Sequence, residues 1–381
     1  MTDALTEFSH PLARLVLHRY PKRRGERLRA WDGADLYLLD LWLEQALGGD
    51  PHAPAPGAPL VLNDSCGALA LALHAAAPVT SGDDALARAA WWANAADNGL
   101  PVQEEAWRWP QAPWPQAPSR VLVRVPKEMA LLEQQLGRLG ALPPGTPVHL
   151  AWMDKHMPGN LLARVRHYLG EVELLRGRYK AHGLTGRVPG SVPDAPYPTS
   201  VKVPEQGWEL VVHAGVFAQQ QLDIGARLFM DTVPQGVPGP IADLGCGNGV
   251  IGMVAAQRNP GVPVTFCDVS WLALQSAREN MARWLPQAPA QFHLGNGLEG
   301  LDTRFALILL NPPFHRGHAV DDSVARMLFA QAAKRLLPGG VLQVIGNRHL
   351  RYDVLLKRHF TTVTQVGGDR KFVVLAANDP R

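Results

Sequence analysis

Cysteine is scarce in this chain of 381 residues, with Cys66, Cys246 and Cys267 as its three thiols. They form no CxxC pair, and no histidine stands near them at the spacing of metal ligands. An odd, scattered set of this kind predicts reduced, buried thiols and excludes both a disulfide framework and a zinc site. We therefore expect no bound metal.

Long hydrophobic runs are also missing. The longest candidate, around Leu69 to Val79, is shorter than the roughly 18 residues that a membrane helix needs, and it contains His74. The first residues, MTDALTEFSHPLARL, have acids before the first base and no apolar core followed by a cleavage site. We expect neither a membrane span nor a secretory signal, and we place the protein in the cytoplasm.

A strong charge of one sign is absent, because the formal net charge is only +3. This mild basic bias permits a polyanionic partner without requiring one. Basic residues nevertheless gather in two clusters, where arginine could bind phosphates and stack on bases, although solvated protein faces explain them equally well. The clusters are Arg19, Lys22, Arg23, Arg24, Arg27 and Arg29, and Arg164, Arg166, Arg176, Arg178, Lys180 and Arg187.

What is present is a globular composition, 46% hydrophobic, in a chain long enough for two domains. Residues 186–206 are rich in proline, glycine and serine without a periodic apolar pattern, which predicts a linker. After it, strand-like runs alternate with helical ones, a pattern typical of a doubly wound, mostly parallel α/β sheet. We therefore predict domains at residues 1–185 and 207–381.

The first half repeats the order of the second half more faintly. We interpret this as an internal duplication in which the first copy kept the fold and lost the chemistry. Chance similarity between two α/β sheets is the alternative. The alignment places Cys66-Gly67 on Cys246-Gly247, Asp83 on Asp268 and Val125-Pro126 on Pro312-Pro313.

The most specific local signal is the run Asp243-Leu-Gly-Cys-Gly-Asn-Gly249, which ends an apolar strand and opens a helix. Its glycines let a ligand lie against main-chain N–H groups at the helix start. The pattern differs from the G-x-G-x-x-G of dinucleotide sites, and Asp243 would repel a pyrophosphate. The loop therefore favours S-adenosylmethionine, whose ammonium group suits an acid, over a nicotinamide or flavin nucleotide.

Two further polar residues follow neighbouring strands of the predicted sheet. Asp268 ends the next strand, where a carboxylate can accept hydrogen bonds from both hydroxyls of a ribose. Asn296 lies in a later loop, where its amide could contact an adenine edge. A helix-capping aspartate and an ordinary turn asparagine are the structural alternatives.

The tetrapeptide Asn311-Pro312-Pro313-Phe314 follows the apolar strand Phe305 to Leu310. The exocyclic amine of a base is a poor nucleophile, because its lone pair is delocalised into the ring. Two acceptors, the Asn311 side-chain oxygen and the Pro312 carbonyl, could take its hydrogens and direct the lone pair at a methyl group. Phe314 could stack on the flipped base. Positioning would then drive catalysis without a metal.

The chain resembles the two-domain bacterial ribosomal RNA guanine-N2 methyltransferases, a class I S-adenosylmethionine-dependent family. The resemblance covers nearly the whole length and favours the large-subunit (23S) enzyme over the small-subunit (16S) one. It implies two tandem Rossmann-like methyltransferase domains, of which the first is degenerate and recognises RNA. The segments that carry it are RLVLHRYP, LNDSCGAL, RVPKEMALLEQQL, VFAQQQLDIGARLF, ADLGCGNGVIG, NPPFHRGHA, GNRHLRY and KFVVLAA.

Family roles transfer to matching positions only. The resemblance implies catalysis by Asn311, Pro312, Pro313 and Phe314. It implies cofactor contacts from Phe217, Asp223, Gly225, Asp243, Gly245, Gly247, Asn248, Asp268 and Asn296. We also expect RNA contacts from Arg23, Arg24, Arg176, Arg178, Lys180, His315 and Arg348. In the first domain, Arg124 stands where Asn311 would be, and Ala68 and Leu69 replace the Asn-Gly of the loop.

One segment fits none of these expectations, the Trp/Pro-rich stretch 107–118, which we interpret as an insert. Rival functions are methylation of a protein glutamine, which poses the same nucleophile problem, and a ribosome-assembly factor with a relic fold. Intact Asp243, Asn311 and Phe314 argue against a relic, and the arginine clusters favour RNA. A nicotinamide-dependent dehydrogenase has no use for the tetrapeptide. We expect a monomer, and the modified guanine stays open.

Overall fold

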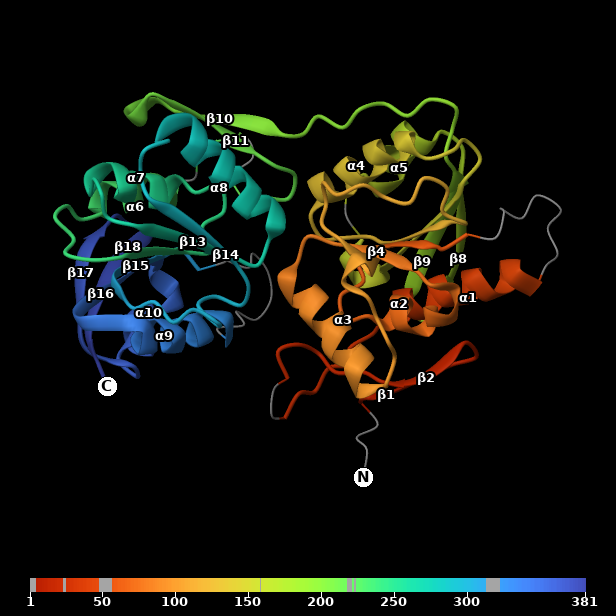
Figure 1. Cartoon of the computed structure of the whole chain (residues 1–381), viewed down its shortest axis with the longest axis horizontal. Coiled ribbons are helices and arrows are strands. Elements are labelled where there is room, and N and C mark those ends of the chain that lie inside the picture. The colour runs from red at the N-terminus through yellow and green to blue at the C-terminus, as the bar shows by residue number, and fades with distance from the viewer. Residues whose placement is uncertain are drawn as a thin grey trace. The chain divides into compact units, whose positions relative to one another are not determined.

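The computed structural model describes residues 5–22, 25–47, 57–157, 159–217, 221–222, 224–312 and 323–381. The chain divides into two compact units, Met1–Tyr197 and Pro198–Arg381 (Figure 1). Among the described residues, no helix is both long and apolar enough to cross a membrane.

The second unit is built around a seven-stranded sheet in the order β14-β13-β12-β15-β16-β18-β17. The strands from β14 to β16 pair in parallel, and β18 runs antiparallel to both of its neighbours, β16 and β17. All six residues of β15 are buried, as expected for a parallel strand covered on both faces. The strands are β12 (Ile241–Leu244), β13 (Val264–Asp268), β14 (Ala290–Leu294), β15 (Phe305–Leu310), β16 (Leu336–Asn347), β17 (Phe360–Gly368) and β18 (Phe372–Pro380).

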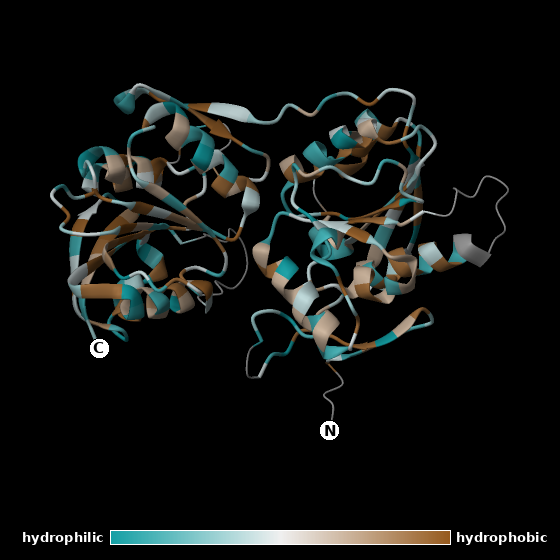
Figure 2. Ribbon diagram, viewed as in Figure 1, coloured by the Kyte–Doolittle hydropathy of each residue, from teal (hydrophilic) through white to brown (hydrophobic). Residues whose placement is uncertain are grey.

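Helices cover both faces of this sheet. Figure 1 shows α6 (Ile224–Thr232), α7 (Val250–Arg258) and α8 (Trp271–Trp284) on one face, and α9 (Ser323–Arg335) and α10 (Tyr352–Leu356) on the other. Hydrophobic residues concentrate in the strands and on the helix faces turned toward them (Figure 2). This arrangement confirms the doubly wound α/β fold.

The first unit repeats the same architecture, with the strand order β5-β4-β3-β6-β7-β9-β8. Each strand has a counterpart at the same place in the second sheet, so the predicted fold duplication is present. The strands are β3 (Leu60–Leu62), β4 (Val79–Ser81), β5 (Trp107–Arg108), β6 (Val121–Arg124), β7 (Pro147–Met153), β8 (Val172–Arg178) and β9 (Ala181–Arg187). The helices are α1 (Gly33–Leu47), α2 (Ala68–Ala72), α3 (Ala85–Asp97), α4 (Met129–Arg138) and α5 (Leu161–Leu169).

A β-hairpin precedes each sheet, formed by β1 (Glu7–His10) with β2 (Ala13–Val16) and by β10 (Thr199–Val203) with β11 (Trp208–Val212). Short 3-10 helices lie elsewhere, at His74–Ala76, Glu104–Ala106, Leu139–Ala141, Asp154–His156, Pro204–Gln206 and Arg348–Leu350.

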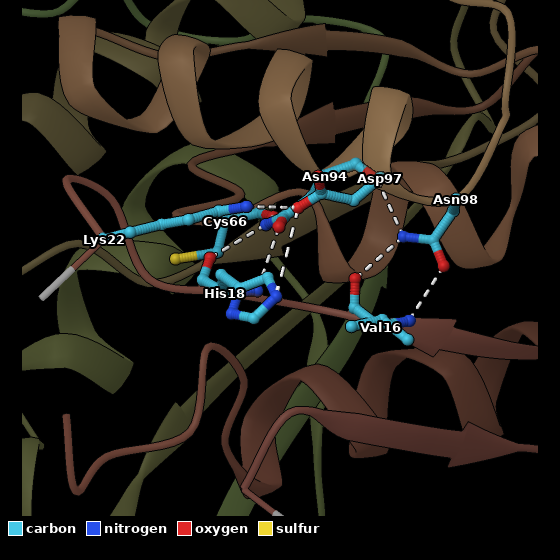
Figure 3. A network of polar contacts seen from close by, with 7 residues as sticks. All are labelled: Val16, His18, Lys22, Cys66, Asn94, Asp97 and Asn98. Carbon is cyan, nitrogen blue, oxygen red and sulfur yellow. Dashed lines mark hydrogen bonds and ion pairs between the residues drawn. The ribbon is translucent and has the colours of Figure 1, made fainter. Parts of the chain in front are cut away.

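One asparagine in each unit ties the end of its hairpin, or the chain just after it, to the loop that follows the sheet's central strand. In Figure 3, Asn94 of α3 donates to the carbonyls of His18 and Cys66, at 2.9 and 2.8 Å, and accepts from the amide of His18. Asn280 of α8 does the same with the backbone of Val211 and the carbonyl of Asn248. The duplication therefore extends to individual polar contacts.

The predicted linker and insert both differ from the observed elements. Residues 186–187 belong to β9, and residues 199–206 form β10 and a 3-10 helix, so only residues 188–198 connect the sheets without such structure. The stretch 107–118 begins with the edge strand β5, so its first two residues belong to the sheet. Trp107 of β5 is buried against Trp91, and Arg138 of α4 covers the ring of Trp114. This strand could not be recognised in the sequence, because it is only two residues long and is followed by tryptophan and proline.

Candidate active site

The site lies at the carboxyl edge of the second sheet. Leu244, the last residue of β12, pairs with Cys267 of β13 on one side and with Leu310 of β15 on the other. The loops that follow these strands therefore start side by side. The chain order reverses between β12 and β15, and ligands of open α/β sheets bind at such a switch point.

The glycine loop after β12 is shaped by its backbone. Gly245, Gly247 and Gly249 all have positive φ, at 74°, 54° and 86°. A Cβ on Gly249 would lie 2.9 Å from the Cβ of Ala277, so this glycine serves the packing of α7 against α8. A Cβ on Gly247 would meet no atom within 4 Å among the described residues. The outer part of the loop therefore borders open space that a ligand could fill.

Asp268, at the end of β13, holds the glycine loop. Its Oδ2 accepts a hydrogen bond from the amide of Gly247 at 3.0 Å, and its Oδ1 accepts from the amide of Ser270 at 3.0 Å. A carboxylate oxygen is a hydrogen-bond acceptor of the kind that a ribose hydroxyl needs. Its position matches the predicted one.

Asp243 occupies a different environment from the other candidate residues. It is 3% exposed, and its Oδ2 accepts from the amide of Gly252 in the first turn of α7 at 2.8 Å. Burial raises its pKa to about 7. The carboxylate therefore stabilises the first turn of α7 through this hydrogen bond. Its contact with a ligand's ammonium group stays a prediction.

Three hydrogen bonds order the loop after β14 around Asn296. Its Nδ2 donates to Glu299 Oε2 at 2.9 Å, and its carbonyl accepts from Gln331 Nε2 at 3.0 Å. Gln331 Oε1 in turn accepts from the amide of Leu298 at 2.9 Å. Gln331 lies on α9, and the sequence analysis did not single it out. Sequence could not reveal it, because its partners are backbone atoms of a distant loop.

Two buried amide atoms at the site have no hydrogen-bond partner among the described residues. They are Oδ1 of Asn311, an acceptor just after β15, and Nδ2 of Asn248, a donor in the glycine loop. The Asn311 carbonyl oxygen lies 3.9 Å from the position of a Cβ on Gly245, so the two loops are adjacent. Buried polar atoms are seldom left unpaired, and this pair is suited to a polar ligand.

The segment expected to cover the cofactor is partly described. Phe217 and Ile224 expose 60% and 64% of their surfaces, whereas Gly225 is buried in α6. Val269, directly after Asp268, is also an exposed apolar residue. Sequence analysis missed Val269, although its place after the strand-ending acid was a usable signal. Pro312 is buried, and Asp223, Pro313 and Phe314 lie outside the described residues.

The equivalent loop of the first unit corrects the sequence alignment. Residues 63–67 and 245–249 each join a strand to a helix in five residues, and Gly67 and Gly249 both precede the helix with positive φ. Gly67 therefore matches Gly249 rather than Gly247, and Cys66 matches Asn248 rather than Cys246. The side-chain contacts support this correspondence, because Asn94 donates to the carbonyl of Cys66 as Asn280 donates to that of Asn248. Ala68 and Leu69 are helical and do not replace the Asn-Gly.

Asp83 was also misaligned. Ser81 pairs with Leu62 as Cys267 pairs with Leu244, which places Gly82 at the position of Asp268. The first unit thus has no carboxylate there, and a Cβ on Gly82 would lie 3.2 Å from the ring of Trp107.

Arg124 does stand at the position of Asn311, because it follows Val123 as Asn311 follows Leu310. It forms ion pairs with Asp32 at 2.9 Å and with Asp35 at 2.8 Å. Burial raises the pKa of Asp35 to about 7, against the opposing effect of Arg124. In the first unit, a buried ion pair therefore occupies the place of the Asn311 amide.

The predicted RNA contacts have varied surroundings. Arg178 pairs with Glu44 and, at 3.7 Å, with Asp40, while Arg176 and Lys180 are exposed. Arg348 Nε donates to the carbonyl of Asp369 at 2.7 Å. Arg23, Arg24 and His315 lie outside the described residues.

The cysteines are buried as expected. Burial raises the pKa of the Cys66 thiol to about 12, and burial also raises the pKa values of the Cys246 and Cys267 thiols. Across the described part of the chain, no three His, Cys, Asp or Glu residues are grouped as metal ligands.

Each of the two units matches a known protein family. Residues 5–189 match the RLMG N-terminal domain family, and residues 207–376 match the Methyltransferase small domain family. The ribosomal RNA large subunit methyltransferase G of Alcanivorax borkumensis is 51% identical, over 99% of this chain and 98% of its own. The protein of that name from Stutzerimonas stutzeri is 43% identical, over 96% and 97%.

A solved structure shares the whole architecture. It is the T. thermophilus 16S rRNA N2 G1207 methyltransferase in complex with AdoMet and guanosine. The TM-score is 0.75 with 24% sequence identity, and the match covers 98% of this chain and 97% of that one. At this identity the likeness shows the two-domain fold.

Proposed function

The chain belongs to the ribosomal RNA large subunit methyltransferase G family, and from this membership we propose that it methylates the exocyclic N2 of a guanine in 23S ribosomal RNA, with S-adenosylmethionine as the methyl donor. The relatives' name specifies the large ribosomal subunit. The observation that carries the choice of an amino group as acceptor is the buried Oδ1 of Asn311, which has no hydrogen-bond partner among the described residues.

The residues at the carboxyl edge fit the proposed cofactor. Among the described residues, Gly247 borders open space and Asn248 Nδ2 is a buried donor without a partner, and Asp268 places a carboxylate acceptor beside them. S-adenosylmethionine, when bound, supplies a methyl group on a positively charged sulfur. Phe217, Asp223, Gly225, Asp243, Gly245 and Asn296 complete the proposed cofactor contacts.

Asn311 and Pro312 hold the acceptor base. The Asn311 Oδ1 and the Pro312 carbonyl accept the two hydrogens of the guanine N2 amine and direct its lone pair at the methyl group. When bound, S-adenosylmethionine would supply the methyl group to this nitrogen, and the amine would lose one hydrogen as a proton. We also assign stacking on the base to Phe314 and restraint of the backbone to Pro313, two residues that lie outside the described part of the chain. Catalysis rests on orientation of the two reactants.

The first unit takes the role of RNA recognition in this proposal. Arg124, Gly82 and Cys66 replace Asn311, Asp268 and Asn248, so the unit lacks each of these candidate groups. We assign residues 1–185 to recognition and residues 207–381 to catalysis.

The test is transfer of labelled methyl groups from S-adenosylmethionine to purified large and small ribosomal RNAs, with nucleoside analysis after digestion. N2-methylguanosine in the large RNA alone is the expected result. Label in the small RNA alone, or in a release-factor protein offered as the control acceptor, would overturn the assignment.

A further inference from the structure

A cluster of basic side chains stands at the same sheet edge as Asn311. It consists of Arg348, His349 and Arg351, which follow β16, and Arg370 and Lys371, which lie in the turn between β17 and β18. All five are exposed. We call them the turn cluster. Two acids lie among them, Asp353 and Asp369, so arginine and lysine outnumber the acids by four to two.

Strand register places the turn cluster beside the catalytic loop. Leu310 of β15 pairs with Val344 of β16, and Asn347, three residues further along, pairs with Phe372 at the start of β18. Residues 348–351 and 369–371 therefore lie at the edge of the sheet where β15 ends and Asn311 follows it. β18 is two strands from β15, a lateral separation of about 10 Å.

Hydrogen bonds hold the turn cluster in a fixed arrangement. Arg348 Nε donates to the carbonyl of Asp369 at 2.7 Å, and the Arg348 amide donates to the carbonyl of Lys371 at 3.0 Å. Asp369 Oδ1 accepts from the amides of Lys371 and Phe372, at 2.7 and 2.6 Å. These bonds lower the pKa of Asp369, whose charge thus serves the turn itself. The side chains of Arg370 and Lys371 make no ion pair with any described residue.

We propose that the turn cluster binds backbone phosphates of the substrate RNA next to the guanine held at Asn311. This inference rests on the proposed function. A nucleotide whose base leaves the stack keeps its phosphates, and those of its neighbours, at the protein surface. Cations on a preorganised turn bind them without sequence preference and anchor the strand while the base reaches Asn311.

The test compares two double variants with the wild type. R370A/K371A removes two cations from the turn cluster. K357A/R358A removes two exposed cations at the opposite end of β17, just before Phe360, and is the matched control. For R370A/K371A we expect the Kd for a fluorescent single-stranded RNA to rise about tenfold, and the slope of log Kd against log salt to flatten by about 1.4.

The KM for large-subunit RNA should rise in R370A/K371A, while kcat at saturating RNA and the Kd for S-adenosylmethionine stay at wild-type values. Equal RNA affinity and salt slope in the two variants would overturn the turn-cluster proposal, even with methyl transfer intact. Conversely, loss of RNA affinity confined to R370A/K371A, in a protein that transfers no methyl to RNA, would support the turn cluster and refute the proposed reaction.

Discussion

The amide of Gly247 donates a hydrogen bond to Oδ2 of Asp268 at 3.0 Å, so the glycine loop of one strand is fixed by the acid that ends the next. A single carboxylate therefore shapes the loop and faces the proposed ribose. Because both roles serve the cofactor, changes at Asp268 should act on its binding.

Asp268→Ala should raise the Kd for S-adenosylmethionine by at least about tenfold, because it removes a charge-assisted acceptor and loosens the loop. Isothermal titration calorimetry on the folded variant measures this effect. An unchanged Kd would remove Asp268 from the cofactor site.

Asn311→Ala should lower kcat by about 10²-fold or more and leave the Kd for S-adenosylmethionine nearly unchanged, because its oxygen acts on the acceptor amine in the transition state. Single-turnover methyl transfer to ribosomal RNA separates this step from product release. Near-normal turnover would show that another group accepts the amine hydrogens.

Gln331→Ala should raise the KM for S-adenosylmethionine more than it lowers kcat, because Gln331 positions the backbone of Asn296 and Leu298 without touching the reacting atoms. Gln275→Ala is the matched control, since Gln275 on α8 donates to Glu279 within its own helix. If the two variants had the same KM, Gln331 would have no positioning role.

The pH dependence of stability should differ between wild type and Asp243→Asn. Burial raises the pKa of Asp243 from 3.8 to about 7, so between these values the folded state holds a proton that the unfolded state releases. The free energy of unfolding of the wild type, relative to the variant, should therefore fall as pH rises from about 4 to about 7, by up to about 1.4 kcal/mol per pH unit. Urea titrations across this range measure the difference, and a flat difference would contradict the burial effect. The pKa of Asp35 is raised as well, but Asp35 is present in both proteins, so its effect cancels in the difference.

Arg124→Ala should lower the free energy of unfolding by about 3 kcal/mol, because it leaves Asp35 buried beside Asp32 without a cation. The Kd for S-adenosylmethionine should not change, since this ion pair fills the first unit's equivalent of the catalytic position. Denaturant unfolding and calorimetry on one preparation give both numbers. Weakened cofactor binding with full stability would instead assign the cofactor to the first unit.

The sequence predicted the fold because glycine spacing, strand-ending polar residues and apolar runs are local signals. Asp268 and Asn311 could be placed in this way, since parallel strands bring their carboxyl ends together. The alignment of Cys66 and Asp83 failed because it matched residue types, whereas the five-residue loop lengths and the strand register fix the true correspondence. Gln331 and the partners of Arg178 could not be predicted, because they depend on contacts between distant segments.

The equal length of the two strand-to-helix loops has an evolutionary meaning. Residues 63–67 and 245–249 span the same turn between matched strands and helices, with a left-handed glycine at the same end. The two loops therefore differ by substitutions alone, with neither an insertion nor a deletion between them. Asn94 and Asn280 make the same contact with these loops in both units. The two halves diverged in side chains and kept a common frame.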